Sequence, residues 1–169
     1  MKSRLWYPQF DIYDTVRRLG LLLLNWGDTI PSSERLNIAD FYLANPPLLH
    51  STKMPLEVRK KFTEMEIEKP QKSFLSYPEP PVLFRKMSDI QRMALQALAG
   101  KGIVSTQGIK DGAIELSEFG TRFVQEKLSD SLQELERELI TFLANDFATI
   151  GKNDLTELRE RTGLRRPLR

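Results

Sequence analysis

The sequence predicts a mainly α-helical fold that contains one small β-hairpin. Apolar residues recur at helical spacing from Met87 to Ala99. Residues 103–107 then form a β-like run, and residues 113–116 alternate between small or polar and large apolar side chains, as a strand does. Asp111-Gly112 between them is typical of tight hairpin turns. Helical spacing returns over residues 117–128, where Ser117 can act as the N-cap. Helix, hairpin and helix is the layout of a winged helix, and a purely structural hairpin is the alternative.

A first helix is expected directly after Asp11, whose carboxylate can cap it. This helix contains the apolar run Leu19–Leu24 and ends at Gly27-Asp28. Because its second half is apolar on nearly every side, we expect it to lie both in the core and in a subunit interface. Leu21 and Leu24 are the residues that we assign to the partner interface.

A second helix is expected to begin at Ser32-Ser33 and to end at Asn45-Pro46-Pro47, because proline removes a backbone donor. An irregular, proline-rich insertion follows at about residues 50–82, with one possible helix over residues 55–68. We expect residues 1–128 to form one winged-helix domain that includes this insertion.

Residues 129–169 are predicted to form a long C-terminal helical extension. Its helix carries an apolar stripe at helical spacing, in which we assign Leu132, Leu135 and Leu139 to the partner interface. A short helix is expected from Asp154 to Arg161, and the tail is basic. The basic residues of the tail are Lys152, Arg159, Arg161, Arg165, Arg166 and Arg169.

Composition excludes several classes of protein. The chain has 169 residues, and its hydrophobic content of 40% is enough for a core. No run of apolar residues is long enough for a membrane span, and no signal-peptide core follows the N-terminal charges. The absence of cysteine excludes disulfides and cysteine-ligated zinc, which fits a cytoplasmic protein. A net charge of +2 is too balanced to imply nucleic-acid binding by itself.

The residues give no support to an enzyme, a cofactor site or a metal site. His50 is the only histidine, and no nucleophile or metal-ligand spacing accompanies it. The glycine-rich stretch from Gly100 to Gly112 has neither the dinucleotide-binding nor the P-loop pattern. We therefore predict a non-catalytic protein.

Basic residues near the predicted hairpin are the candidates for DNA contact. Cations that share one surface can bind phosphates, although Asp89, Asp111 and Glu115 are mixed among them. This favours non-specific contact with double-stranded DNA over readout of bases. The candidates are Arg85, Lys86, Arg92, Lys101 and Lys110.

Three stretches resemble one protein family. Phe10 to Asp14, Arg35 to Pro46, and the pattern from Met93 to Gly120 are similar to the middle components of bacterial ABC-three-component systems. These systems are built around SMC-type ABC ATPases and include Lamassu anti-phage defence. The resemblance implies a winged-helix accessory subunit that joins an SMC-like ATPase to an effector, commonly a nuclease. The trigger would be invading DNA, and the outcome abortive infection.

A stand-alone winged-helix transcriptional regulator is the alternative function. Such a regulator should form a dimer and place a strongly basic helix in the major groove. The apolar first helix, the leucine-rich late helix and the modest charge favour protein partners instead.

Overall fold

The computed structural model describes residues 7–70 and 79–165, and within these ranges the chain is almost entirely helical. The mainly α prediction is confirmed. The predicted β-hairpin and winged helix are wrong, because the described residues form only two isolated β-bridges and no strand. The α-helices are α1 (Ile12–Asn25), α2 (Ser33–Ala44), α3 (Leu56–Glu64), α4 (Pro80–Gly100), α5 (Thr106–Lys110), α6 (Glu118–Lys127), α7 (Glu134–Thr141) and α8 (Leu155–Thr162).

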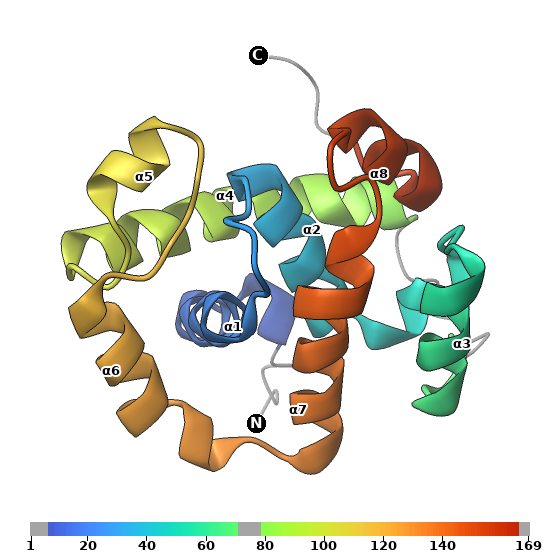
Figure 1. Ribbon diagram of the computed structural model, residues 1–169, viewed down its shortest axis with the longest axis horizontal. Coiled ribbons are helices and arrows are strands. Elements are labelled where there is room, and N and C mark those ends of the chain that lie inside the picture. Colours follow the sequence, from blue (N-terminus) through green and yellow to red (C-terminus); the bar gives the residue numbers. More distant parts are fainter. Residues whose placement is uncertain (1–6, 71–78, 166–169) are drawn as a thin grey trace, which may run out of the picture.

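Helix α1 lies at the centre of the molecule, surrounded by α2, α4, α6 and α7 (Figure 1). Its predicted cap is confirmed, since the Asp11 carboxylate accepts a hydrogen bond of 2.9 Å from the Asp14 backbone N–H. Leu19, Leu21 and Leu22 are fully buried. The apolar run is therefore explained by neighbours within the chain that cover the helix on several sides.

Helices α2 and α4 form one side of the core against α1. Ser32 caps α2 as predicted, and α2 ends at Ala44, before the expected proline pair. Helix α4 begins at Pro80, about two turns before the predicted start at Met87. Pro80 and Pro81 occupy the first turn, where a helix needs no N–H donor, so these prolines start the helix.

Helix α5 begins inside the segment predicted as the first strand of the hairpin, residues 103–107. The Ser105 hydroxyl accepts a hydrogen bond of 3.2 Å from the Gly108 N–H and so caps a short helix. Asp111 has a φ of −83° and Gly112 a φ of +77°. A hairpin turn of type I′ needs a positive φ at both positions, so this Asp-Gly pair does not form one.

The two arms of the predicted hairpin meet at a single bridge, Val104 to Leu116. The other bridge joins Ala113 to Ser32, and the Ile114 N–H donates to the Pro31 carbonyl at 2.8 Å. The second arm is therefore paired partly with the loop before α2. This pairing across the chain replaces the local hairpin.

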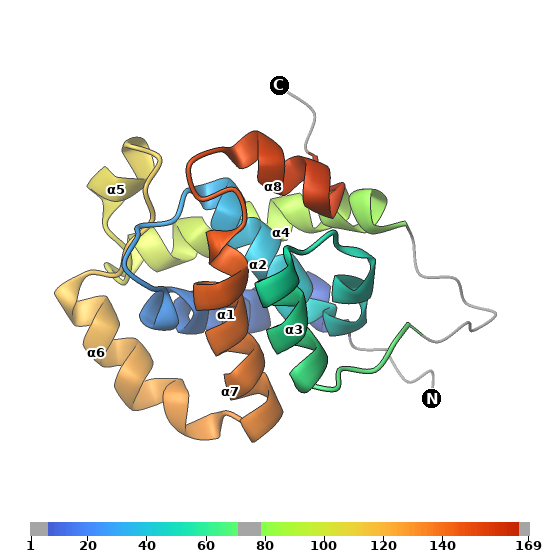
Figure 2. The ribbon, with the colours of Figure 1, turned by 45° about the vertical axis from the view of Figure 1, so that its right-hand side comes forward.

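The segment after Leu128, which was predicted as a C-terminal helical extension, packs against the core of the same chain. Helix α7 continues into a π-helical segment, Phe142–Asp146, and a 3-10 turn, Phe147–Thr149. Most of its apolar stripe packs against α1, α2 and α3, and α3 lies beside it in Figure 2. Leu135 is the exception, because it is 55% exposed.

Polar contacts also hold the C-terminal region in place. The Arg35 guanidinium donates to the carbonyls of Ala148 at 3.2 Å and Ile150 at 2.7 Å, and to that of Gly151. Arg159 on α8 makes a bidentate ion pair with Glu34, with both contacts at 2.6 Å. The predicted short helix is present as α8, and the Asp154 carboxylate caps it. The predicted tail residues Arg166 and Arg169 lie outside the described residues.

Candidate functional site

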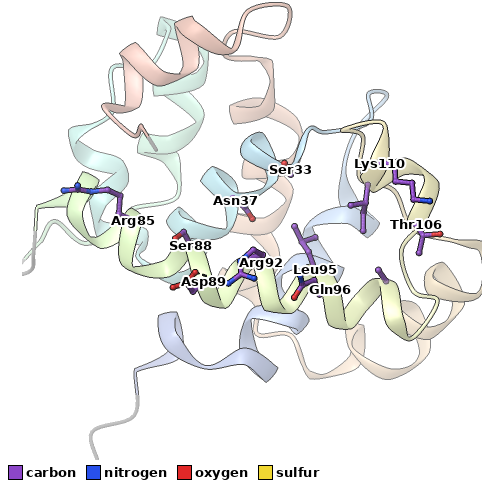
Figure 3. A pocket seen from close by; sticks show the side chains of 12 residues that line it. Ser33, Asn37, Arg85, Ser88, Asp89, Arg92, Leu95, Gln96, Thr106 and Lys110 are labelled. Carbon is purple, nitrogen blue, oxygen red and sulfur yellow. Dashed lines mark hydrogen bonds and ion pairs between the residues drawn. The ribbon is translucent and has the colours of Figure 1, made fainter. Parts of the chain in front are cut away.

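An open groove of about 820 Å³ runs along α4, between the start of α2 and α5 (Figure 3). We call it the α4 groove. Helix α2 is far in sequence from α4 and α5, so the groove exists only in the folded chain. Its lining residues are Ser33 and Asn37 from α2, Arg85, Ser88, Asp89, Arg92, Leu95, Gln96 and Ala99 from α4, and Thr106, Ile109 and Lys110 from α5.

Helical periodicity explains the α4 wall of the groove. Arg85, Ser88, Arg92, Gln96 and Ala99 recur at intervals of three or four residues and therefore share one face. Other faces of α4 carry the buried residues that pack on the core. The α5 wall is held in place by the bridge between its following loop and the residue before α2.

A buried polar network lies at the junction of α1, α2 and α4. The Arg18 Nε lies 2.7 Å from the Asp40 Oδ1, and the Gln91 Nε2 donates to the Asp40 Oδ2 at 2.8 Å. Gln91 also donates to the Asn37 carbonyl at 3.0 Å. Burial opposes the charge on Arg18, but Asp40 and Asp14 outweigh that effect and raise its pKa. The network fixes the backbone of α2 at Asn37, a residue of the groove.

The structure brings together three of the five predicted DNA-contact cations. Arg85, Arg92 and Lys110 line the α4 groove, with Arg85 and Lys110 toward its opposite ends (Figure 3). Lys86 and Lys101 are exposed but are not part of the lining. The Arg92 guanidinium lies 3.2 Å from the Asp89 carboxylate, which partly neutralises it. DNA contact by these residues stays a prediction.

The sequence reasoning missed the polar and apolar residues that accompany these cations. Asn37 is the most informative of them, since its side chain points from α2 toward α4 (Figure 3). It is 5% exposed, and its Oδ1 atom has no hydrogen-bond partner within the described ranges. One signal was available: Ser33 and Asn37 stand one turn apart and therefore share one face of their helix. The sequence did not show that α5 lies beside α4.

The residues predicted for a partner interface lie at different depths. Leu21 is 0% and Leu139 is 3% exposed, so both are core residues of this chain. Leu24 and Leu132 are partly buried against that core. Leu135 is 55% exposed and is the most exposed member of the set. An interface at Leu135 stays a prediction.

His50 contacts a backbone carbonyl and an aromatic ring. Its Nε2 lies 2.7 Å from the Ile67 carbonyl oxygen, and its ring meets the edge of Phe62 at a centroid distance of 4.9 Å. No cluster of potential metal ligands occurs among residues 7–70 and 79–165. In the same ranges, no helix has the length and apolar character that crossing a membrane requires.

Comparison with known proteins identifies the family. A family model described as "ABC-three component (ABC-3C) system Middle Component 5" matches residues 4–166. The chain belongs to this family. No curated protein and no solved structure matches it. The ABC-three-component part of the resemblance is thereby confirmed, and the chain is an accessory subunit of such a defence system that works with the system's other proteins.

Proposed function

We propose that the chain is a non-catalytic subunit that links an SMC-like ABC ATPase to a nuclease effector in a Lamassu-like system. Family membership supports the accessory role. The α4 groove is the structural observation that supports the linking role, because a surface groove can receive a segment of a partner protein. In this proposal the complex acts in the cytoplasm, responds to invading DNA and causes abortive infection.

The lining of the groove favours a protein partner over a DNA duplex. Leu95, Ala99 and Ile109 supply apolar surface, and charged side chains of both signs surround it. An apolar centre with a polar rim is the usual anatomy of a protein interface. A duplex needs many cations on one surface, whereas only Arg85, Arg92 and Lys110 of the predicted set share the groove.

Leu135→Asp tests the linking role at an exposed site outside the groove. We expect the variant to lose one of the other components in a pull-down from cells that co-express the whole system, because a charge replaces apolar contact surface. Its thermal unfolding should stay unchanged, since Leu135 is 55% exposed. Leu56→Asp on α3 is the matched control, because Leu56 is 80% exposed. Equal recovery of both components by both variants would remove Leu135 from the interface.

A pair of double variants distinguishes a protein-binding groove from a DNA-binding face. Arg92→Glu with Lys110→Glu reverses two cations of the groove, and Lys86→Glu with Lys101→Glu reverses two outside it. We expect the groove pair to lose a protein component and the outer pair to retain both. If the five cations instead contact phosphates, each double variant should weaken binding of a DNA duplex by the complex. The slope of log affinity against log salt concentration should then become shallower by about 0.9 for each lost contact.

A further inference from the structure

We propose that the α4 groove binds an extended acidic segment of a partner protein. The identity of the partner, another component of the same system, rests on the proposed function. The chemistry of the segment rests on the residues of the groove alone. Three features of the groove favour such a segment: the excess of cations, an unpaired buried acceptor, and the length of the groove along α4.

The charge of the groove is complementary to carboxylates. Three exposed cations, Arg85, Arg92 and Lys110, stand against one carboxylate, Asp89. The Arg92–Asp89 pair is exposed on both sides and joins residues three positions apart on α4. Such a surface pair contributes little, so a carboxylate of a ligand can compete for Arg92. Arginine also binds carboxylates through two parallel hydrogen bonds, which favours this class of ligand.

Asn37 distinguishes a peptide from a nucleic-acid backbone. Its Oδ1 atom is buried and lacks a hydrogen-bond partner among the described residues, although buried polar atoms are nearly always paired. This oxygen is an acceptor and therefore needs an N–H or O–H donor. A peptide in extended conformation offers free backbone N–H groups, whereas a helix offers them only in its first turn. The phosphodiester backbone of duplex DNA offers no such donor.

The dimensions of the groove fit a short extended segment. Along α4, the rise from Arg85 to Ala99 is about 21 Å, at about 1.5 Å per residue. An extended chain covers that length with about six residues. Because side chains of an extended segment alternate, one set can meet Leu95, Ala99 and Ile109 while the other meets the cations. Acidic and apolar residues should therefore alternate in the ligand.

Fluorescence polarisation with the full chain tests this inference directly. The probes are a labelled peptide of alternating glutamate and leucine, a matched peptide of alternating lysine and leucine, and a labelled DNA duplex. We expect saturable binding of the glutamate peptide and none of the lysine peptide. Arg92→Glu with Lys110→Glu should lower the affinity for the glutamate peptide about tenfold and shift the preference to the lysine peptide. The outer pair, Lys86→Glu with Lys101→Glu, should change the affinity by less than about twofold.

Asn37→Leu and Asn37→Ala separate recognition from a structural role. Both variants remove the unpaired oxygen, so we expect the glutamate peptide to bind about tenfold more weakly. At least one of them should unfold at the same or a higher temperature than the original chain, because no hydrogen bond of that oxygen is lost. A lower unfolding temperature in both, with unchanged peptide affinity, would show that Asn37 acts only in the fold.

The inference is overturned if the glutamate peptide binds no better than the lysine peptide. It is also overturned if the duplex binds in a manner that depends on Arg92 and Lys110 while the glutamate peptide does not bind. Peptide binding is measured on the isolated chain, and the pull-down is measured on the assembled system. The groove chemistry and the linking function can therefore fail independently of each other.

Discussion

Arg18→Met is expected to destabilise the fold by about 4 kcal/mol. Arg18 is 2% exposed, and its guanidinium donates to Asp40, to Asp14 and to the Pro8 carbonyl. Asp40 is 0% exposed, so the variant leaves its carboxylate buried with the neutral donor Gln91 and no cation at this site. Loss of one partner of a buried ion pair costs far more than the pair contributes. Chemical denaturation monitored by circular dichroism measures the difference.

A double variant tests whether the unpaired charge causes this loss of stability. Arg18→Met with Asp40→Leu removes both charges, so it should be more stable than the sum of the two single effects predicts, by about 2 kcal/mol. Arg17→Met is the matched control on the same helix. Arg17 pairs with Glu136 at 2.5 Å, but both side chains are about one quarter exposed, so the cost should be near 1 kcal/mol. Equal losses at positions 17 and 18 would contradict the role of burial.

The starts of α1, α2, α6 and α8 could be predicted from sequence because a cap is a local interaction. Asp11, Ser32, Ser117 and Asp154 all accept hydrogen bonds from backbone N–H groups two or three residues later. The apolar run in α1 likewise predicted burial. Its buried faces meet helices of the same chain, so burial of Leu21 needed no second subunit. The periodicity of apolar residues predicts that a helix face is buried, but it does not predict whether the same chain or a partner buries it.

The hairpin was mispredicted because two local signals competed. Residues 103–107 form a β-like run, but Ser105 can also cap a helix, and the capped helix α5 is what forms. Tertiary contacts decide the outcome, since the segment after Asp111 pairs with Pro31 and Ser32. The candidate site depends on the same contacts. Arg92 and Lys110 share a groove because α5 lies beside α4, and nothing in the sequence shows that Asn37 lacks a partner.

Gly120→Ala is expected to destabilise the fold by about 3 kcal/mol and to lower the unfolding temperature by about 6–12 °C. Gly120 lies in the first turn of α6, against the backbone of Ile103. An added Cβ would overlap the Ile103 carbonyl oxygen and lie 2.7 Å from its carbonyl carbon. That oxygen also accepts a hydrogen bond of 2.9 Å from the Ser117 N–H. It cannot move away without disturbing the start of α6.

Gly100→Ala is the matched control, because a Cβ at Gly100, the last residue of α4, meets nothing within 4 Å. This change should be neutral or stabilise by up to about 1 kcal/mol. Displacement of Ile103 should also move α5, because only Val104 and Ser105 separate Ile103 from the first residue of α5. We therefore expect Gly120→Ala, but not Gly100→Ala, to weaken binding of the glutamate–leucine peptide even at temperatures where the chain stays folded. Equal unfolding temperatures for the two variants would show that α6 can move away from Ile103 at little cost.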